Sequence, residues 1–260
     1  MFIEERHESI LAILKEAGRI SVGDIQEKFN VSVDSARRDL RILEEKGLLK
    51  RTHGGAIPLP QVGTLPHRYR DMKAMPVLDN YNLIAKRAVT YIKENDVVYL
   101  TSSSFGFLML KHLPRDIHYT LVVNSVTLAE ELKYWDNVVV YIVGGKMRMH
   151  GTTSLVDSLA TAFVKNIHFD ISFMNGAGVE ASFGLSNGSD ETATFQRAVI
   201  ENTRKNILLL PSEKIGFKSF IKVCDVNKFD TLITDWDALE EELTKIEDLG
   251  VDVIVVDKDC

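Results

Sequence analysis

The chain has 260 residues, of which 45% are hydrophobic and 26% charged, and its formal net charge is −6. This composition is typical of a soluble globular protein and leaves room for one small and one larger domain. No apolar run approaches the length of a membrane span and Met1 to Arg6 is not a signal sequence, so we expect a cytoplasmic protein with no membrane partner. Cys224 and Cys260 are the only cysteines, too few for a disulfide framework or a zinc site, and no metal or cofactor is expected.

Three helices are predicted in the first 46 residues. Arg6 to Ala17 has an amphipathic pattern, and a second helix begins at Ser21, with Asp24 placed for a capping box. The third helix is predicted from the N-cap Ser32 to about Lys46, because Gly47 supplies a left-handed exit. Its apolar stripe consists of Val33, Ala36, Leu40 and Leu43, with Asp34, Arg38 and Arg41 on the opposite face and Ser35 and Arg37 flanking them.

A short β-hairpin is predicted directly after the third helix. Leu48–Thr52 is a strand, His53-Gly54-Gly55 a tight turn and Ala56-Ile57 the start of the return strand, and we expect a positive φ at Gly54. Three helices followed by such a wing are typical of a winged helix-turn-helix, whose third helix enters the major groove of DNA.

The stretch VSVDSARRDLRILEEKGLLKRTHGGA, from Val31 to Ala56, resembles the signature of DeoR-family bacterial transcriptional regulators. The resemblance assigns Arg37, Arg38, Gly54 and Gly55 to a DNA-binding module. Ser35 and Ala36 replace the threonine and isoleucine usual in the family. These replacements bear on which bases the module prefers and not on whether the module is present. The predicted DNA-binding set is Ser35, Arg37, Arg38, Arg41, Arg51, His53, Gly54 and Gly55.

The negative charge of the chain lies outside this module. Residues 1–57 contain ten basic and ten acidic side chains, which leaves 21 basic and 27 acidic ones in the rest. DNA affinity therefore has to come from the local placement of arginines, and we expect weak, salt-dependent binding by a monomer and a homo-oligomer that binds repeated half-sites of double-stranded DNA. Taken alone, the arginines do not favour DNA binding over an ordinary solvated helix face, but the capped helix, the preceding short helix and the glycine wing together do. His53 fits a turn residue without a role, and fits a wing residue near phosphate somewhat better.

The predicted domains are a winged helix-turn-helix at 1–57, a linker at 58–78 and an effector-sensing α/β domain at 79–260. The linker contains four prolines, which make it semi-rigid; a passive tether and a spacer that transmits domain geometry are equally compatible with it. From Asp79 onward, short apolar strands alternate with helices, which predicts a doubly covered, mostly parallel sheet. The predicted strands are 97–100, 120–123, 138–143, 171–174, 207–210, 231–234 and 253–256, and the predicted helices are 82–93, 107–112, 127–133, 155–165, 191–205 and 238–249.

Ligands of parallel sheets bind beyond the carboxyl ends of the strands. Ser102-Ser103-Ser104, Asn124 and Lys214 each follow a predicted strand. Serines that lead into a helix suit an anion, but on this evidence alone N-capping explains them better. Lysines such as Lys214 are more often surface residues, and Asn124-Ser125 more often forms a turn.

The DeoR resemblance extends over nearly the whole chain and implies a C-terminal domain similar to ribose-5-phosphate isomerase that binds a small metabolite, in many members a phosphorylated sugar. It implies an effector pocket formed by Ser102, Ser103, Ser104, Asn124, Glu191 and Lys214. Two departures concern the ligand. Ala177 stands where the family commonly has an aspartate, and Phe105 adds bulk near the serines, so the pocket is predicted to take a different effector or to have lost it.

The sequence therefore predicts a repressor of sugar or carbohydrate metabolism genes, controlled by a small metabolite such as a sugar phosphate, and not an enzyme. The alternative is a sugar-phosphate isomerase-like enzyme with an appended DNA-binding-like domain. Ala177 and the lack of a clear general-base carboxylate beside Lys214 weigh against the alternative.

Overall fold

The computed structural model describes residues 3–58, 78–148 and 154–258. The chain forms two compact units, one made mainly of residues up to 61 and one that contains the large sheet. The predicted linker falls mostly on 59–77, outside the described residues. No helix in the described parts of the chain is both long and apolar enough to cross a membrane.

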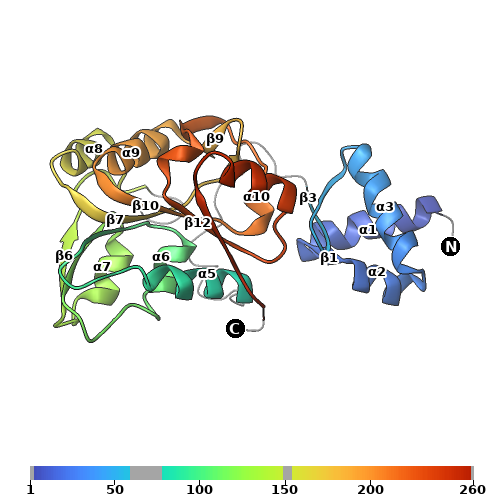
Figure 1. The fold of residues 1–260 in the computed structure, drawn as a ribbon, viewed down its shortest axis with the longest axis horizontal. Coiled ribbons are helices and arrows are strands. Elements are labelled where there is room, and N and C mark those ends of the chain that lie inside the picture. Colours follow the sequence, from blue (N-terminus) through green and yellow to red (C-terminus); the bar gives the residue numbers. More distant parts are fainter. Residues whose placement is uncertain (1–2, 59–77, 149–153, 259–260) are drawn as a thin grey trace. The chain divides into compact units, whose positions relative to one another are not determined.

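The N-terminal unit, here called the head, contains three helices and a small antiparallel sheet in the order β1-β3-β2 (Figure 1). Its elements are α1 (Ile3–Ala17), β1 (Ile20–Ser21), α2 (Val22–Phe29), α3 (Val33–Glu45), β2 (Leu49–Arg51) and β3 (Gly55–Pro58).

Capping residues set the helix ends of the head. Ser21 and Asp24 form the expected capping box at the start of α2, and Asn30 ends that helix in the left-handed conformation. Ser32 caps α3 through the backbone N–H of Ser35. The head has its own core, built from Ile10, Leu14, Ile20, Ile25, Ala36, Leu40, Leu43, Leu49 and Ala56. Val33, expected in the apolar stripe, is 37% exposed because it lies in the first turn of α3.

The larger unit is built on a seven-stranded sheet in the order β13-β12-β10-β7-β4-β5-β6, in which every neighbouring pair is parallel. The strands are β4 (Val97–Leu100), β5 (Tyr119–Val123), β6 (Val138–Ile142), β7 (Phe169–Met174), β10 (Thr203–Leu209), β12 (Thr231–Asp235) and β13 (Asp252–Val256). The predicted parallel α/β architecture is confirmed.

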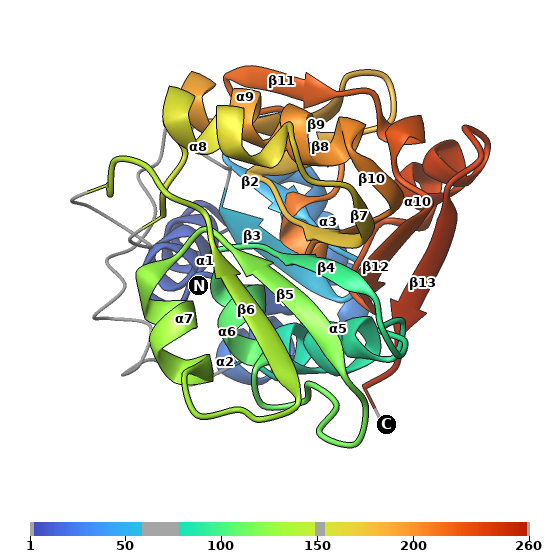
Figure 2. The same cartoon turned by 90° about the vertical axis from the view of Figure 1, so that its left-hand side faces the viewer.

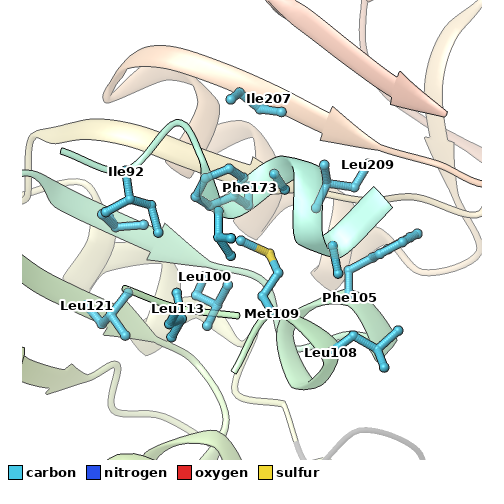
Figure 3. Packing of buried hydrophobic residues seen from close by; sticks show 14 of the residues in the cluster. Ile92, Leu100, Phe105, Leu108, Met109, Leu113, Leu121, Phe173, Ile207 and Leu209 are labelled. Carbon is cyan, nitrogen blue, oxygen red and sulfur yellow. The ribbon is translucent and has the colours of Figure 1, made fainter. Parts of the chain in front are cut away.

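Helices cover both faces of this sheet, as both views show (Figures 1 and 2). On one face lie α5 (Asp79–Val89), α6 (Ser104–Met109) and α7 (Val126–Leu132), and on the other lie α8 (Ser158–Val164) and α9 (Asp190–Glu201); α10 (Glu240–Glu247) precedes β13. A core of aliphatic and aromatic side chains fills the space between the sheet and α5 to α7. In Figure 3, Phe105 and Met109 of α6 pack in this core with Leu100 of β4 and Phe173 of β7.

Some predicted elements differ from the structure. The helix expected over 191–205 ends at Glu201, and 203–205 belong to β10, because the strand needs these residues to pair with β7. A second, antiparallel sheet in the order β11-β9-β8 was not predicted, since its strands are only three or four residues long. They are β8 (Gly178–Glu180), β9 (Gly184–Asn187) and β11 (Ile221–Cys224).

Candidate functional site

Helix α3 exposes a row of arginines on the face opposite its core stripe. Arg37, Arg38 and Arg41 are exposed, whereas Ala36 and Leu40 are buried. Guanidinium groups displayed in this way can contact both phosphate oxygens and guanine edges. The predicted DNA-binding arginines of α3 therefore lie together on one accessible face.

Asp39 also lies in α3 but points inward, and it fixes the helix to α1. Asp39 Oδ2 accepts a hydrogen bond from Arg6 Nε at 2.6 Å, and Asp39 Oδ1 accepts one from Arg6 Nη2 at 3.0 Å. His7 Nε2 also lies 3.1 Å from Asp39 Oδ1. The hydrogen bond to Asp39 raises the pKa of Arg6. Asp39 is only 1% exposed, so the sequence, where it appears as one more charge on a polar helix, did not indicate this role.

The wing places the remaining predicted head residues in different environments. Arg51 is tied to α3, because Glu44 Oε2 accepts from its Nε at 2.7 Å and Glu44 Oε1 accepts from its backbone N–H at 2.8 Å. His53 and Gly54 are exposed and Gly55 is buried. Ser35 is partly exposed in the first turn of α3, where its hydroxyl lies 3.0 Å from that of Ser32.

The expected positive φ at Gly54 is wrong, because the left-handed glycines of the head are Gly18 and Gly47. The steric demand lies instead at Gly55. A Cβ atom there would sit 2.0 Å from the carbonyl oxygen of Ile20, since β1 and β3 pair closely at this point. Only glycine fits such an approach of two backbones.

A small cleft of about 90 Å³ separates α3 from the wing. Its lining combines cationic and apolar side chains: Val22, Arg37, Leu40, Arg51, Thr52, His53 and Gly55. Arg37 and His53 thus belong to the same hollow, which brings helix and wing residues of the predicted set together.

In the larger unit, the strand order reverses between β4 and β7, and the crevice at such a reversal is the usual ligand site of a parallel sheet. The two strand ends are joined by a hydrogen bond of 2.7 Å from Thr101 Oγ1 to Asn175 Oδ1. Ser102 and Ser104 follow Thr101 and are partly exposed, while the Ser103 hydroxyl is buried and has no hydrogen-bond partner among the described residues.

Asn124, at the end of β5, has both ends of its amide engaged inside the protein. Its Oδ1 accepts from the Tyr99 hydroxyl at 3.0 Å, and its Nδ2 donates to the Leu155 carbonyl at 3.1 Å. Asn124 is 1% exposed and therefore supports the loop beside the crevice. Glu191, by contrast, is exposed in the first turn of α9, and no hydrogen bond or ion pair within the described ranges joins it to Lys214 or to the serines.

Lys214 follows β10 and reaches toward the end of β7, where its Nζ donates to the Gly176 carbonyl at 3.3 Å. Burial lowers the pKa of Lys214. The neighbouring Glu213 accepts a hydrogen bond of 2.7 Å from the Tyr81 hydroxyl of α5, and burial raises the pKa of Glu213. The site thus pairs a lysine that loses its proton more easily than usual with a carboxyl group that holds its proton more tightly.

Asp235, at the end of β12, completes this group. Its Oδ2 accepts from the backbone N–H of Ser212 at 2.8 Å and from Asn80 Nδ2 at 3.2 Å, and the side chain is fully buried. Burial and the nearby Glu213 and Asp235 raise the pKa of Tyr81 well above its ordinary value. The loop after β10 and the end of β12 are therefore tied to the start of α5 by the partly buried Glu213 and the buried Asp235.

Comparison with known proteins connects both units to one family. The DeoR-like helix-turn-helix domain matches residues 6–61, and the DeoR C-terminal sensor domain matches residues 79–236. The chain is 30% identical to the HTH-type transcriptional regulator GlpR of Haloferax volcanii, with 98% of each chain covered. It is 28% identical to the lactose phosphotransferase system repressor of Staphylococcus aureus, with 97% of this chain and 98% of the relative covered.

The chain belongs to the DeoR family. It is a DNA-binding transcriptional regulator with a C-terminal sensor domain, as the sequence predicted. Among solved structures, ribose 5-phosphate isomerase A of Methanocaldococcus jannaschii is similar at 17% identity and a TM-score of 0.37, over 52% of this chain and 53% of that one. A score this low says nothing about activity.

The structure of this DeoR-family chain corrects two statements about its sensor domain. Phe105 does not project its bulk among the serines; it is 1% exposed and stacks on Tyr81 with ring centroids 5.1 Å apart. A carboxylate beside Lys214 is present after all, since Glu213 is its neighbour and is buried enough for a raised pKa. In the sequence, Glu213 could have been found as an acidic residue between the end of a strand and Lys214. Its environment could not, because its hydrogen-bond partner Tyr81 lies 132 residues away.

Proposed function

We propose that this protein is a cytoplasmic repressor that binds operator DNA through α3 and the wing and responds to a small carbohydrate-related metabolite. The observation that carries the DNA-binding part is the exposed row of Arg37, Arg38 and Arg41 on a helix whose opposite face is held by buried Asp39. Because Asp39 anchors α3 to α1, it also fixes where the three arginines point, which suits a helix that enters the major groove. The head corresponds to residues 1–57 and the sensor to 79–260.

Operator binding is tested by fluorescence anisotropy with DNA from upstream of the gene itself. Arg38→Ala should weaken binding about fivefold or more, because one guanidinium contact to a base or phosphate is worth about 1–3 kcal/mol. Arg204→Ala removes the same charge from an exposed site of the sensor and serves as the matched control. Equal loss in both variants, or none in Arg38→Ala, would refute the assignment of α3.

For the effector, we infer a ligand site at the reversal between β4 and β7. Ser102, Ser103 and Ser104 offer hydroxyl groups and Lys214 a cation on opposite sides of it, while Asn124 supports the neighbouring loop. Glu191 is the weakest member of the set, because it is exposed at the start of α9. The lactose phosphotransferase system repressor among the relatives supports a sugar or sugar phosphate as the ligand class.

Calorimetry against matched sugars and sugar phosphates tests this site. A ligand that binds should lose affinity in Lys214→Met and keep it in Lys218→Met, a lysine whose ion pair with Glu180 lies at the surface. The same ligand should change operator affinity, since an effector acts only through a difference in affinity between the DNA-competent and DNA-incompetent states. Binding that is indifferent to Lys214 would place the effector elsewhere.

We also infer that the sensor is not an enzyme. Ala177 supplies no proton carrier, and the Glu213 carboxyl group is already engaged by the Tyr81 hydroxyl. An isomerase assay with ribose 5-phosphate should show no turnover. Turnover by the wild-type protein that disappears in Glu213→Gln would instead support the isomerase-like alternative.

A further inference from the structure

Strand β6 forms one edge of the large sheet, and no described strand pairs with its outer side. Its sequence, VVVYI, contains no charge, proline or glycine. Natural proteins usually protect exposed edges with lysines, prolines, bulges or a covering segment, because an open edge pairs readily with another strand. Val138–Ile142 itself carries no such protection and no strand of the described residues pairs with its outer side, which indicates that another chain can cover this edge.

The side chains of β6 divide between the two faces of the sheet. Val138 and Val140 contribute to the core beneath α5 to α7. Val139 and Tyr141 point to the other face and are 58% and 52% exposed. Ile142 alternates onto the face of Val138 and Val140 but is 50% exposed at the strand end. The surface of β6 is thus apolar on its open side.

Helix α8 lies on that same face of the sheet and adds two exposed apolar side chains (Figure 1). Leu159 is 69% exposed and Phe163 is 38% exposed. With aromatic side chains contributing about 150–250 Å² when fully exposed, these two residues and Val139 and Tyr141, together with Ile142 at the strand end, present on the order of 400–500 Å² of apolar surface along this edge. A standard interface needs about 800 Å² per partner, of which roughly 60% is apolar, so the patch matches a dimer in size.

The charges at the two ends of β6 select one arrangement of two copies. Asp136 precedes the strand and Lys146 follows it, and both are exposed. Antiparallel pairing of two β6 strands brings the acidic end of each toward the basic end of the other, whereas parallel pairing would bring like charges together. The opposite sheet edge differs, because β13 carries the exposed Asp252 within the strand.

We propose that a second copy of this chain docks on the β6 edge, with the two β6 strands antiparallel about a two-fold axis near Val140. This rests on the proposed function, in which paired heads bind repeated half-sites. Pairing centred on Val140 places Val139 of each copy opposite Tyr141 of the other, a favourable aromatic and β-branched pair. The interface is isologous and closes on itself, which matches a palindromic operator.

Disulfide trapping tests the geometry in a full-length Cys224→Ser, Cys260→Ser background. Val140→Cys should form a covalent dimer on mild oxidation, because facing residues of antiparallel strands have Cα atoms about 4.5–5.5 Å apart. Val138→Cys is the matched control, since its two copies would lie about 13 Å apart along the strands. Equal trapping of both variants, or of neither, would overturn the proposed pairing.

Sedimentation tests the surface independently. The wild-type protein should have at least twice the 29.3 kDa mass of one chain, and Tyr141→Lys should halve that mass, whereas Val255→Lys on the β13 edge should leave it unchanged. A monomeric wild type, or an unchanged Tyr141→Lys, would overturn the proposal. Failure of the proposed function looks different: Arg38→Ala would then leave DNA binding intact, whatever the mass.

Discussion

Replacing Asp39 by asparagine tests the inward anchor of the recognition helix. The change keeps the shape of the side chain but removes the charge that three donor atoms of Arg6 and His7 face. Removing one partner of a buried ion pair costs about 3–5 kcal/mol, and the retained amide oxygen still accepts one hydrogen bond, so we expect a loss of about 2–4 kcal/mol. The Arg6 side chain, only 14% exposed, is left close to an amide donor.

A loss of this size is comparable to the whole stability of the head. At about 0.05–0.15 kcal/mol per residue, a head of this length is stable by roughly 3–9 kcal/mol. Native-state hydrogen exchange of the full chain measures the effect, with the amides of the large sheet as the internal reference. The amides of α3 should exchange at least thirtyfold faster in Asp39→Asn, and operator binding should weaken in parallel.

Asp34→Asn is the matched control for this experiment. Asp34 lies in the first turn of the same helix and is exposed, so its replacement should cost no more than about 1 kcal/mol through the helix dipole. If the α3 amides of Asp39→Asn exchanged as slowly as those of Asp34→Asn, the buried carboxylate would not anchor the helix.

Three further outcomes are expected. Gly55→Ala should destabilise the head by about 1–3 kcal/mol in thermal unfolding, because its Cβ meets the Ile20 carbonyl oxygen at 2.0 Å; an unchanged melting temperature would contradict this. Glu213→Gln should stabilise the sensor domain at neutral pH, measured as the free energy of unfolding. The raised pKa of Glu213 favours the protonated acid in the folded state, so the wild type loses stability as pH rises above the ordinary pKa of 4.5. The variant keeps an acceptor for the Tyr81 hydroxyl and should not lose stability in this way. Burial raises the pKa of Cys224 to about 12, so iodoacetamide at pH 8 should modify it far more slowly in the folded than in the unfolded protein.

The sequence predicted those elements whose cause is local. Helix α3 begins and ends within about one residue of its predicted limits because Ser32 caps it and Gly47 supplies the exit. Strand β4 has the predicted limits, and every predicted strand of the large sheet exists, because continuous apolar runs identify buried strands.

The features that sequence reasoning missed depend on partners far along the chain. Asp39 resembles a solvated charge until Arg6, 33 residues away, is placed beside it. The requirement for glycine falls on Gly55 and not on Gly54 because of the pairing with Ile20. Strand β8 has only three residues, too few to show a hydrophobic periodicity, and it forms because β9 lies beside it to pair with.

The central pair of the large sheet has a consequence for how the protein folds during synthesis. Strands β4 and β7 are neighbours in space, yet the bond from the Val97 amide to Asp170 closes a loop of 73 residues. Such closure is slow and cannot happen until β7 has left the ribosome, whereas the Arg6–Asp39 ion pair that anchors α3 closes a loop of only 33 residues. The three helices and the wing should therefore be able to fold on the nascent chain while the sensor domain is still open and in need of protection from aggregation.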